Sequence, residues 1–197
     1  MEARFGADGN PVVCAVTMSL PERLVWLDLE MTGPDPDTDH ILEIASVVTD
    51  RELQVVAEGP SLVVSQPASV LAAMDAFVTQ MHTASGLLDR VRRADTNVKA
   101  AEAATVAFLR EHVLEGKSPL CGSTIWKDRI FLKRYMPAVD ALLHYRNVDV
   151  STLKELVARW YPQLQPPPKK TTHRALDDIH ESLAELRFYR REVFVSV

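Results

Sequence analysis

The sequence has few cysteines, no long apolar run and no excess of basic residues. Its two cysteines, Cys14 and Cys121, are too few for a disulfide framework and are typical of a reducing compartment. No apolar stretch reaches the roughly 18–20 residues that a transmembrane helix needs, so we expect a cytoplasmic protein that does not bind membranes. With 22 Lys and Arg against 27 Asp and Glu, the chain is not a globally basic nucleic-acid binder. A nucleic-acid enzyme with an acidic metal site remains compatible with this charge.

The size and composition are those of one globular domain. The chain has 197 residues, of which 47% are hydrophobic and 25% are charged, which is enough for a substantial core. Residues 11–20 are mildly apolar, but they lack the positively charged start and the longer apolar region of a secretory signal. We therefore interpret residues 1–21 as a variable N-terminal extension and residues 22–197 as a single domain.

Residues 24–30, Leu-Val-Trp-Leu-Asp-Leu-Glu, are the stretch around which the rest of the chain is interpreted. A strand points residues i and i+2 to the same face, so Asp28 and Glu30 should project side by side from a strand whose apolar flank indicates burial. Two ionised carboxylates next to a core repel each other and lose hydration, which a bound cation offsets. The strand is therefore predicted to supply two metal ligands. Taken alone, the pair would also fit a solvated strand end.

Hydrophobic periodicity and turn residues predict strands first and then helices. The first three strands follow one another closely and predict an antiparallel meander, and the later helices alternate with two more strands. We expect a mixed α/β sheet of about five strands flanked by helices. Pro137 should end or interrupt a helix, and Glu43 is interpreted as a surface charge of its strand. The predicted strands are 24–30, 41–49, 53–64 with a break at 58–60, 118–124 and 144–150, and the predicted helices are 67–76, 84–93, 97–113, 127–136, 151–161 and 174–192.

Two further acidic sites lie at predicted helix starts. Asp128 follows the strand and loop of residues 121–127, and by itself would be a helix N-cap. Asp178 lies in the first turns of the last helix, where its neighbour Asp177 suits the helix dipole. His173 precedes Asp178 by five residues, which on a helix is a rotation of about 140°, so the two would not share a face. His173 is therefore placed just before the helix, at the end of a Pro-rich loop, where a base could swing over a metal site.

Three ordered motifs and two linking segments carry a resemblance to a known family. The motifs are Asp28–Gly33 with Ile41–Ala45, Cys121–Gly122 through Asp128–Arg129 to Tyr135–Pro137, and His173 through Asp178; the linking segments begin at His82 and Asp149. This set resembles the oligoribonucleases of the DEDDh exonuclease superfamily. The similarity extends over about residues 22–192 and is far more specific than an Asp-x-Glu pair alone.

The resemblance implies a fold, a reaction and a set of metal ligands. The implied fold is ribonuclease-H-like, and the implied protein is a homodimeric exonuclease that hydrolyses short RNA, especially dinucleotides, from the 3′ end to nucleoside 5′-monophosphates. Two Mg²⁺ or Mn²⁺ ions per active site agree with the preference of these ions for oxygen ligands. His173 would be the general base, because an imidazole pKa of about 6.5 allows it to accept a proton near neutral pH. The implied metal ligands are Asp28, Glu30, Asp128 and Asp178.

The resemblance also implies substrate contacts. Phe77 takes the place of a base-stacking Trp, and its ring also offers a flat face. Tyr145, a catalytic residue, and Arg146 match residues that each subunit lends to the site of the other. Thr124, in place of Ser, and Ser151 match residues that cap the 5′ phosphate and so limit substrate length. The implied substrate-binding residues are Met31, Pro34, Phe77, His82, Thr124, Arg146 and Ser151.

Further positions depart from the family pattern. Pro34 stands where a Leu wedge usually separates two bases, Trp126 replaces a Gly and Lys127 replaces a Gln. Two alternatives therefore stay open, namely a DEDDh exonuclease for longer RNA or DNA 3′ ends and a catalytically inactive dimer that binds nucleotides. The segments that begin at His82 and Asp149 argue against the first. Retention of the four carboxylates and the base argues against the second.

Overall fold

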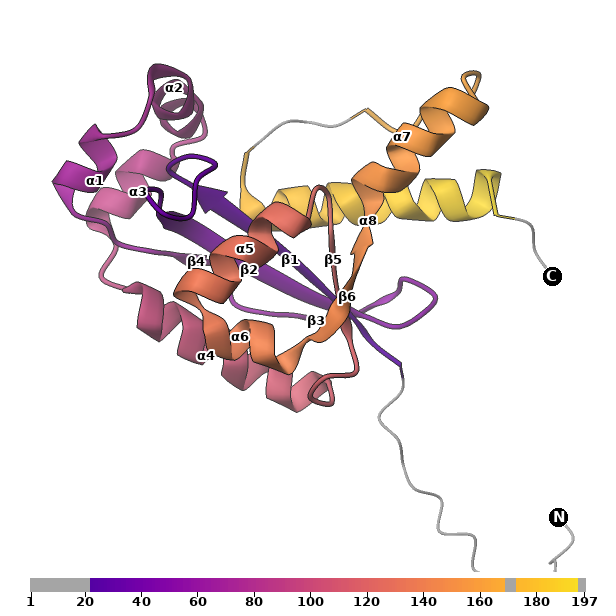
Figure 1. Ribbon diagram of the computed structural model, residues 1–197, viewed down its shortest axis with the longest axis horizontal. Coiled ribbons are helices and arrows are strands. Elements are labelled where there is room, and N and C mark those ends of the chain that lie inside the picture. The colour runs from indigo at the N-terminus through magenta and orange to yellow at the C-terminus, as the bar shows by residue number, and fades with distance from the viewer. Residues whose placement is uncertain (1–21, 169–172, 195–197) are drawn as a thin grey trace, which may run out of the picture.

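The computed structural model describes residues 22–168 and 173–194, and its centre is a mixed six-stranded sheet (Figure 1). The strand order is β3-β2-β1-β5-β6, and β4 pairs with β2 outside this path. β1 is antiparallel to β2 and parallel to β5, and β5 is parallel to β6. The strands are β1 (Leu24–Met31), β2 (Ile41–Thr49), β3 (Val55–Glu58), β4 (Leu62–Val63), β5 (Pro119–Gly122) and β6 (His144–Asp149).

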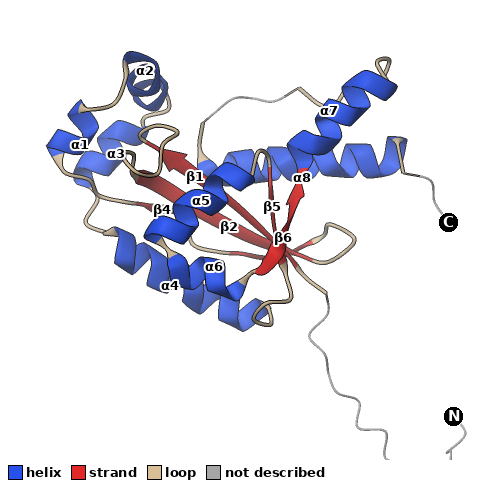
Figure 2. Ribbon diagram, viewed as in Figure 1, coloured by secondary structure: helices blue, strands red, loops and turns tan. Residues whose placement is uncertain are grey.

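Helices cover both faces of this sheet (Figure 2). α4, α5 and α6 pack on one face, α7 and α8 pack on the other, and α1, α2 and α3 cluster at the end where β1 finishes (Figure 1). Within residues 22–168 and 173–194, no helix is both long and apolar enough to cross a membrane. The helices are α1 (Ala68–Ala72), α2 (Ala76–Ala84), α3 (Leu87–Arg93), α4 (Val98–His112), α5 (Trp126–Tyr135), α6 (Pro137–Leu142), α7 (Val150–Trp160) and α8 (Ala175–Glu192).

Alternation along β1 divides the core into two parts. Val25 and Leu27 pack with residues of α4, α5 and α6, whereas Trp26 packs with residues of α7 and α8. Successive side chains of a strand point to opposite faces, so Asp28 and Glu30 continue the face of Trp26 and point toward α8. The order of apolar residues in β1 therefore determines the side of the sheet on which the two carboxylates lie.

The predicted mixed sheet flanked by helices is confirmed, with differences in detail. The expected strand 53–64 is divided at its predicted break into β3 and β4, both of which pair with β2. The sequence did not indicate α2, which begins after the N-cap Asp75, whose side chain accepts a backbone hydrogen bond of 2.8 Å. Pro137 interrupts the helix as expected, and it also begins α6, where its missing N–H costs nothing. The predicted extension, residues 1–21, lies outside the described residues.

Candidate active site

Four carboxylates meet near the end of β1. Asp28 and Glu30 come from β1 and Asp178 from the first turns of α8, and one oxygen of each lies within 4.8 Å of the other two. Asp128 comes from the first turn of α5, and its Oδ1 accepts a hydrogen bond of 2.9 Å from the backbone N–H of Leu29, between the two acidic residues of β1. The structure thus clusters three of the four predicted metal ligands, and the hydrogen bond from Leu29 holds the fourth, Asp128, next to β1.

The topology explains this convergence. β5 runs parallel to β1, so both strands finish at the same end of the sheet, and residues 123–125 lead from β5 directly into α5. α8 packs against β1 and β2 and begins at that end as well (Figure 1). The carboxyl ends of parallel strands are a common location for binding sites in α/β sheets. Two helix starts and one strand end therefore supply the acidic side chains.

Burial and mutual repulsion change the proton affinity of these carboxylates. Burial, followed by the charges of Asp128, Glu30 and Asp178, raises the pKa of Asp28 well above its usual value. Burial is also the largest cause for Glu30, whose pKa rises to about 8, and for Asp128, whose pKa rises to about 7. The hydrogen bond from Leu29 partly opposes the rise at Asp128. Without a cation, the site therefore binds protons near neutral pH.

The donor set fits a hard divalent cation. Each donor is a carboxylate oxygen, and such ligands favour small, hard cations over soft ones. A cation would replace the bound protons and compensate the repulsion that raises the pKa of the carboxyl groups. The chemistry of the donors and their closeness therefore agree with the predicted metal site.

The raised pKa of Glu30 predicts that the metal-free protein loses stability as pH rises. The ordinary pKa of 4.5 applies to the unfolded chain and about 8 to the folded protein, so between these values the folded state binds more protons. The corresponding stabilisation is present below the lower pKa and is lost as pH rises through the higher one. We expect the melting temperature in EDTA to fall between about pH 5 and pH 8, by about 2–4 °C for each kcal/mol lost. An added divalent cation should reverse the fall.

Glu30→Gln is the matched control for this measurement, because glutamine keeps the shape of the side chain without a titrating proton. In EDTA, the variant should gain melting temperature relative to the wild type as pH rises. A difference between the two proteins that does not change with pH would contradict the role assigned to Glu30.

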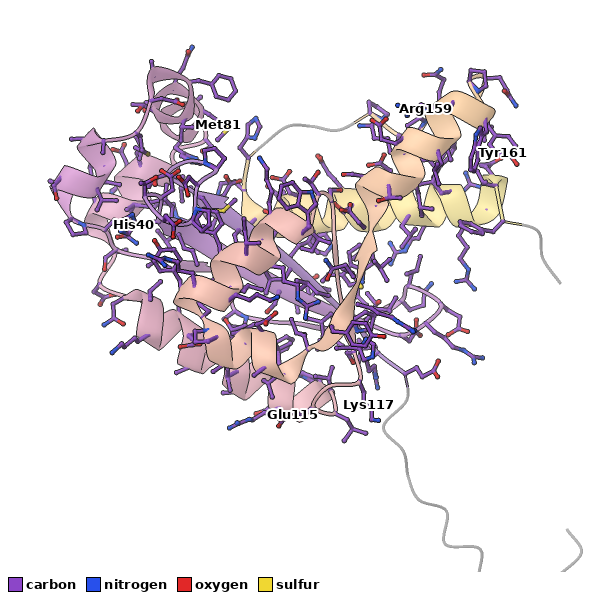
Figure 3. All side chains as sticks on the ribbon, viewed as in Figure 1. His40, Met81, Glu115, Lys117, Arg159 and Tyr161 are labelled. Carbon is purple, nitrogen blue, oxygen red and sulfur yellow. The ribbon has the colours of Figure 1, made fainter. Side chains whose placement is uncertain are left out.

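His173 and Phe77 line the same cavity. The cavity has a volume of about 690 Å³ and lies between α2 and the start of α8. Met81 of α2, labelled in Figure 3, contributes to its lining. The Phe77 residue is 73% exposed, so its ring is accessible for stacking. His173 has a backbone φ of 50°, in the left-handed region that is uncommon for residues other than glycine. The structure thus places the predicted base and the predicted stacking residue at one cavity.

His82 is buried beneath the end of β1. Its Nε2 lies 2.9 Å from the carbonyl oxygen of Met31, to which it donates a hydrogen bond, and its Nδ1 lies 3.9 Å from Glu30. Burial lowers the pKa of His82, which favours the neutral imidazole. His82 and Met31 therefore stabilise the strand that carries the carboxylates. Their contact with a substrate remains a prediction.

Thr124 and Ser151 contact each other. Their hydroxyl oxygens are 3.0 Å apart. One oxygen of Asp149 accepts hydrogen bonds from the backbone N–H groups of both residues, each at 2.9 Å. Thr124 has a φ of 55°, which is strained for a β-branched residue, and such strain is frequent at functional sites. The geometry therefore presents the two hydroxyls together, as the implied phosphate cap requires.

Tyr145 and Arg146 lie at the outer edge of the sheet. The pairing of β6 with β5 shifts register between Pro119 and Leu120, and the two residues fall in this bulge. The buried Arg129 donates hydrogen bonds of 2.8–3.3 Å to three carbonyl oxygens of the bulge. Tyr145 is 74% exposed and Arg146 is exposed as well. Both side chains are thus accessible to another molecule, although their contribution to a second subunit remains a prediction.

Pro34 is exposed in the loop after β1, and this loop is held by side-chain contacts. Asp39 accepts hydrogen bonds from the hydroxyl of Thr32 and the backbone N–H of Asp35, both at 2.9 Å. Gly33 approaches Asp39 so closely that a Cβ would lie 2.5 Å from its carboxylate. The loop therefore presents a proline at a defined position. The role of Pro34 between two bases remains a prediction.

The interpretation of Glu43 as a surface charge of its strand is wrong. Glu43 is fully buried in β2 and lies directly opposite Glu30 in the register of β1 and β2. Its carboxylate accepts hydrogen bonds from the guanidinium of Arg174, which lies 131 residues later in the chain. The apolar residues on both sides of Glu43 indicated burial, but its distant partner could not be recognised without the fold.

Comparisons with known proteins agree with this geometry. The family model RNase_T, described as “Exonuclease”, matches residues 25–186. A Dichelobacter nodosus protein named “Oligoribonuclease” is 53% identical over 179 residues, which cover 91% of this chain and 99% of that protein. An Alkalilimnicola ehrlichii protein of the same name is 60% identical over 168 residues, which cover 85% of this chain and 87% of that protein.

One similar solved structure is a zinc-bound form of Escherichia coli exonuclease I in complex with single-stranded DNA. It matches with a TM-score of 0.60 and 18% sequence identity, over 88% of this chain and 41% of that chain. The chain thus spans about two fifths of the exonuclease I chain, and at this identity the match concerns the fold alone. The prediction of a ribonuclease-H-like fold is confirmed.

Proposed function

Because the chain belongs to the oligoribonuclease family of exonucleases, we propose that it degrades very short RNA, dinucleotides above all, to nucleoside 5′-monophosphates. Membership of the family makes the protein a nuclease with 3′-to-5′ exoribonuclease activity. The observation that carries the proposal is the meeting of Asp28, Glu30 and Asp178 within 4.8 Å in a chain so similar to oligoribonucleases. The proposal adds the substrate length, the metal ions and the roles of individual residues.

In the proposed mechanism, His173 takes the proton from the attacking water. The four carboxylates of the site would hold two Mg²⁺ or Mn²⁺ ions. When bound, such a pair of cations stabilises both the attacking and the leaving oxygen of the displacement. Neutral imidazole is the form that accepts the proton.

The preference for short RNA is supported by the positions of the two substrate-binding regions. Phe77, at the cavity that His173 also lines, would stack on the 3′ base. The adjacent hydroxyls of Thr124 and Ser151 would donate hydrogen bonds to the 5′ phosphate. When the terminal 5′ phosphate is bound by these hydroxyls, no further nucleotide fits on the 5′ side, so the length of the RNA is limited.

The proposed homodimer completes this phosphate site. In the proposal, the exposed Tyr145 and Arg146 of one subunit contact the substrate of the other. The register shift leaves these two residues without partners in β5, and the buried Arg129 supports the arrangement because it binds the carbonyl oxygens of this segment.

The expected location is the cytoplasm, a prediction that rests on the low cysteine content.

The test is hydrolysis of 5′-phosphorylated RNA of two and seven nucleotides, with Mg²⁺, with Mn²⁺ and with EDTA. We expect nucleoside 5′-monophosphates only when metal is present, and kcat/KM roughly tenfold or more higher for the dinucleotide, because loss of one charge-assisted contact costs about that factor. A preference for the longer RNA or for DNA would favour an exonuclease of longer 3′ ends. Binding of the dinucleotide without cleavage in every metal would favour an inactive nucleotide-binding dimer.

A further inference from the structure

Glu43 is a buried carboxylate beside the metal site that is not one of its ligands. It has no solvent exposure and lies opposite Glu30 across the β1–β2 pair. Both of its oxygens are already bound by Arg174, since Nη2 donates to Oε1 at 2.6 Å and Nε donates to Oε2 at 3.0 Å. A second cation, the guanidinium of Arg90 on α3, lies 3.7 Å away. Such a carboxylate is a poor candidate for a cation ligand and a good one for a structural anchor.

The anchor acts at the first residues of α8. Helix starts expose backbone N–H groups that a capping side chain usually satisfies, but the N-cap residue Arg174 forms no side-chain hydrogen bond to them. Instead, the backbone N–H of Ala175 donates a hydrogen bond of 3.2 Å to Oε2 of Glu43. The carboxylate of β2 thus replaces the missing cap and also suits the positive end of the helix dipole.

The residue that depends most on this anchor is His173. Ala175 and Ile179 are buried against the sheet, and farther along α8 the hydroxyl oxygen of Ser182 lies 2.8 Å from that of Ser123, so the body of the helix has contacts that do not involve Glu43. His173 lies outside the helix with a φ of 50°, joined directly to Arg174. An unfavourable backbone conformation persists only where its surroundings impose it. The salt bridge and the cap fix the residues on the C-terminal side of His173.

We propose that Glu43 and Arg174 form a clamp that positions His173 in the cavity between α2 and the start of α8. Both are positioning residues that act through the base: Glu43 is buried beneath the site, and Arg174, which also lines the cavity, joins Glu43 to His173. The inference rests on the proposed function, in which His173 is that base. In this proposal β2, which carries Glu43, positions the base in addition to pairing with β1.

Charge-preserving variants test the clamp without changing the net charge beside the metal ions. In Arg174→Lys, a single ammonium replaces the guanidinium that binds both oxygens of Glu43. In Glu43→Asp, the side chain is shorter by one methylene, so the carboxylate lies farther from Arg174. Misplacement of a catalytic base should lower kcat about 10- to 100-fold and leave KM for the dinucleotide nearly unchanged. The metal concentration that gives half of the rise in melting temperature should not change. Arg159→Lys, which alters an exposed pair with Glu155 far along α7 (Figure 3), is the matched control.

A double-mutant cycle separates positioning from general destabilisation. In a His173→Ala background, Arg174→Lys should lower the remaining kcat by less than about twofold, because the clamp has no base left to position. Amide hydrogen exchange at Ala175 should accelerate in Arg174→Lys and in Glu43→Asp, but not in Arg159→Lys. If Arg174→Lys fails to fold, Glu43→Asp provides the same cycle.

The two possible failures give different results. An equal loss of kcat with and without His173 would overturn the clamp and leave the proposed exonuclease intact. A His173→Ala variant as active as the wild type would overturn the role of the base in the proposed function, and the clamp with it. A raised KM at unchanged kcat would likewise overturn positioning in favour of a substrate-binding role.

Discussion

Asp28→Asn is expected to lower kcat for dinucleotide hydrolysis by about 10³-fold, because a lost metal ligand removes several kcal/mol of transition-state stabilisation. Asparagine keeps the shape of the side chain but not its charge. Asp28 is the central member of the site, since the charges of Asp128, Glu30 and Asp178 all raise its pKa. The measurement is the steady-state rate on a 5′-phosphorylated dinucleotide at saturating metal.

The stability of the same variant shows whether the loss of activity reflects misfolding. Burial and neighbouring charges disfavour the ionised form of Asp28, as its raised pKa indicates. Asp28→Asn should therefore unfold in EDTA at the wild-type temperature or above it. The rise in melting temperature on addition of a divalent cation should disappear. An inactive variant that melts lower in EDTA, or that keeps the full metal-dependent rise, would contradict the assignment of Asp28 as a ligand.

Two adjacent residues of α8 provide a matched pair of variants. Asp178 lies within the carboxylate cluster, whereas the side chain of Asp177 is exposed. Asp178→Asn should show the large loss of kcat and of metal-dependent stabilisation, whereas Asp177→Asn, at the cavity that His173 lines, should keep the metal-dependent stabilisation. Both variants remove one charge from the same helix turn, so an effect of overall charge or of the helix dipole would appear in both.

Two of the metal-site carboxylates could be predicted from the sequence by a local rule, and the family resemblance supplied the other two. Period two places Asp28 and Glu30 on one face of a strand, whereas Asp128 alone would be a helix N-cap and was identified as a ligand, like Asp178, through the family motifs. The placement of His173 before the last helix rested on rotation about a helix axis, and the structure bears it out. For Asp28, Glu30 and His173, a few neighbouring residues and a regular geometry were enough.

The contacts that organise these residues could not be predicted, because their partners are distant in sequence. Glu43 and Arg174 are brought together only by the packing of α8 on β2, and Arg129 finds its carbonyl partners only in the bulge of β6. The helix that carries Phe77 was missed for a different reason. Its apolar and polar residues follow no clear period in the sequence. Asp75 can be identified as its N-cap only from the hydrogen bond that its side chain accepts in the structure.

A mixture of two inactive variants is expected to recover activity if subunits share residues. The first variant carries Tyr145→Ala and Arg146→Ala in the same chain. Its kcat should be about 100-fold lower, because two groups that orient the substrate phosphate are lost. A mixed dimer contains one chain of this double variant and one chain of Asp28→Asn. The double-variant chain has intact carboxylates and receives Tyr145 and Arg146 from the Asp28→Asn chain. One site per mixed dimer is then complete, and random pairing should restore roughly one quarter of wild-type activity.

Co-expression of the two chains, followed by an assay of dinucleotide hydrolysis, makes this measurement. The control mixture combines Asp28→Asn with His173→Ala. Under the proposal, each substitution disables the site of the subunit that carries it, so no pairing of the two chains gives a complete site. Recovery in the first mixture and not in the second would establish that Tyr145 and Arg146 act across the interface. Activity in the first mixture no higher than the mean of its two components would mean that both residues serve their own subunit. The exposed bulge of β6 would then need a different explanation.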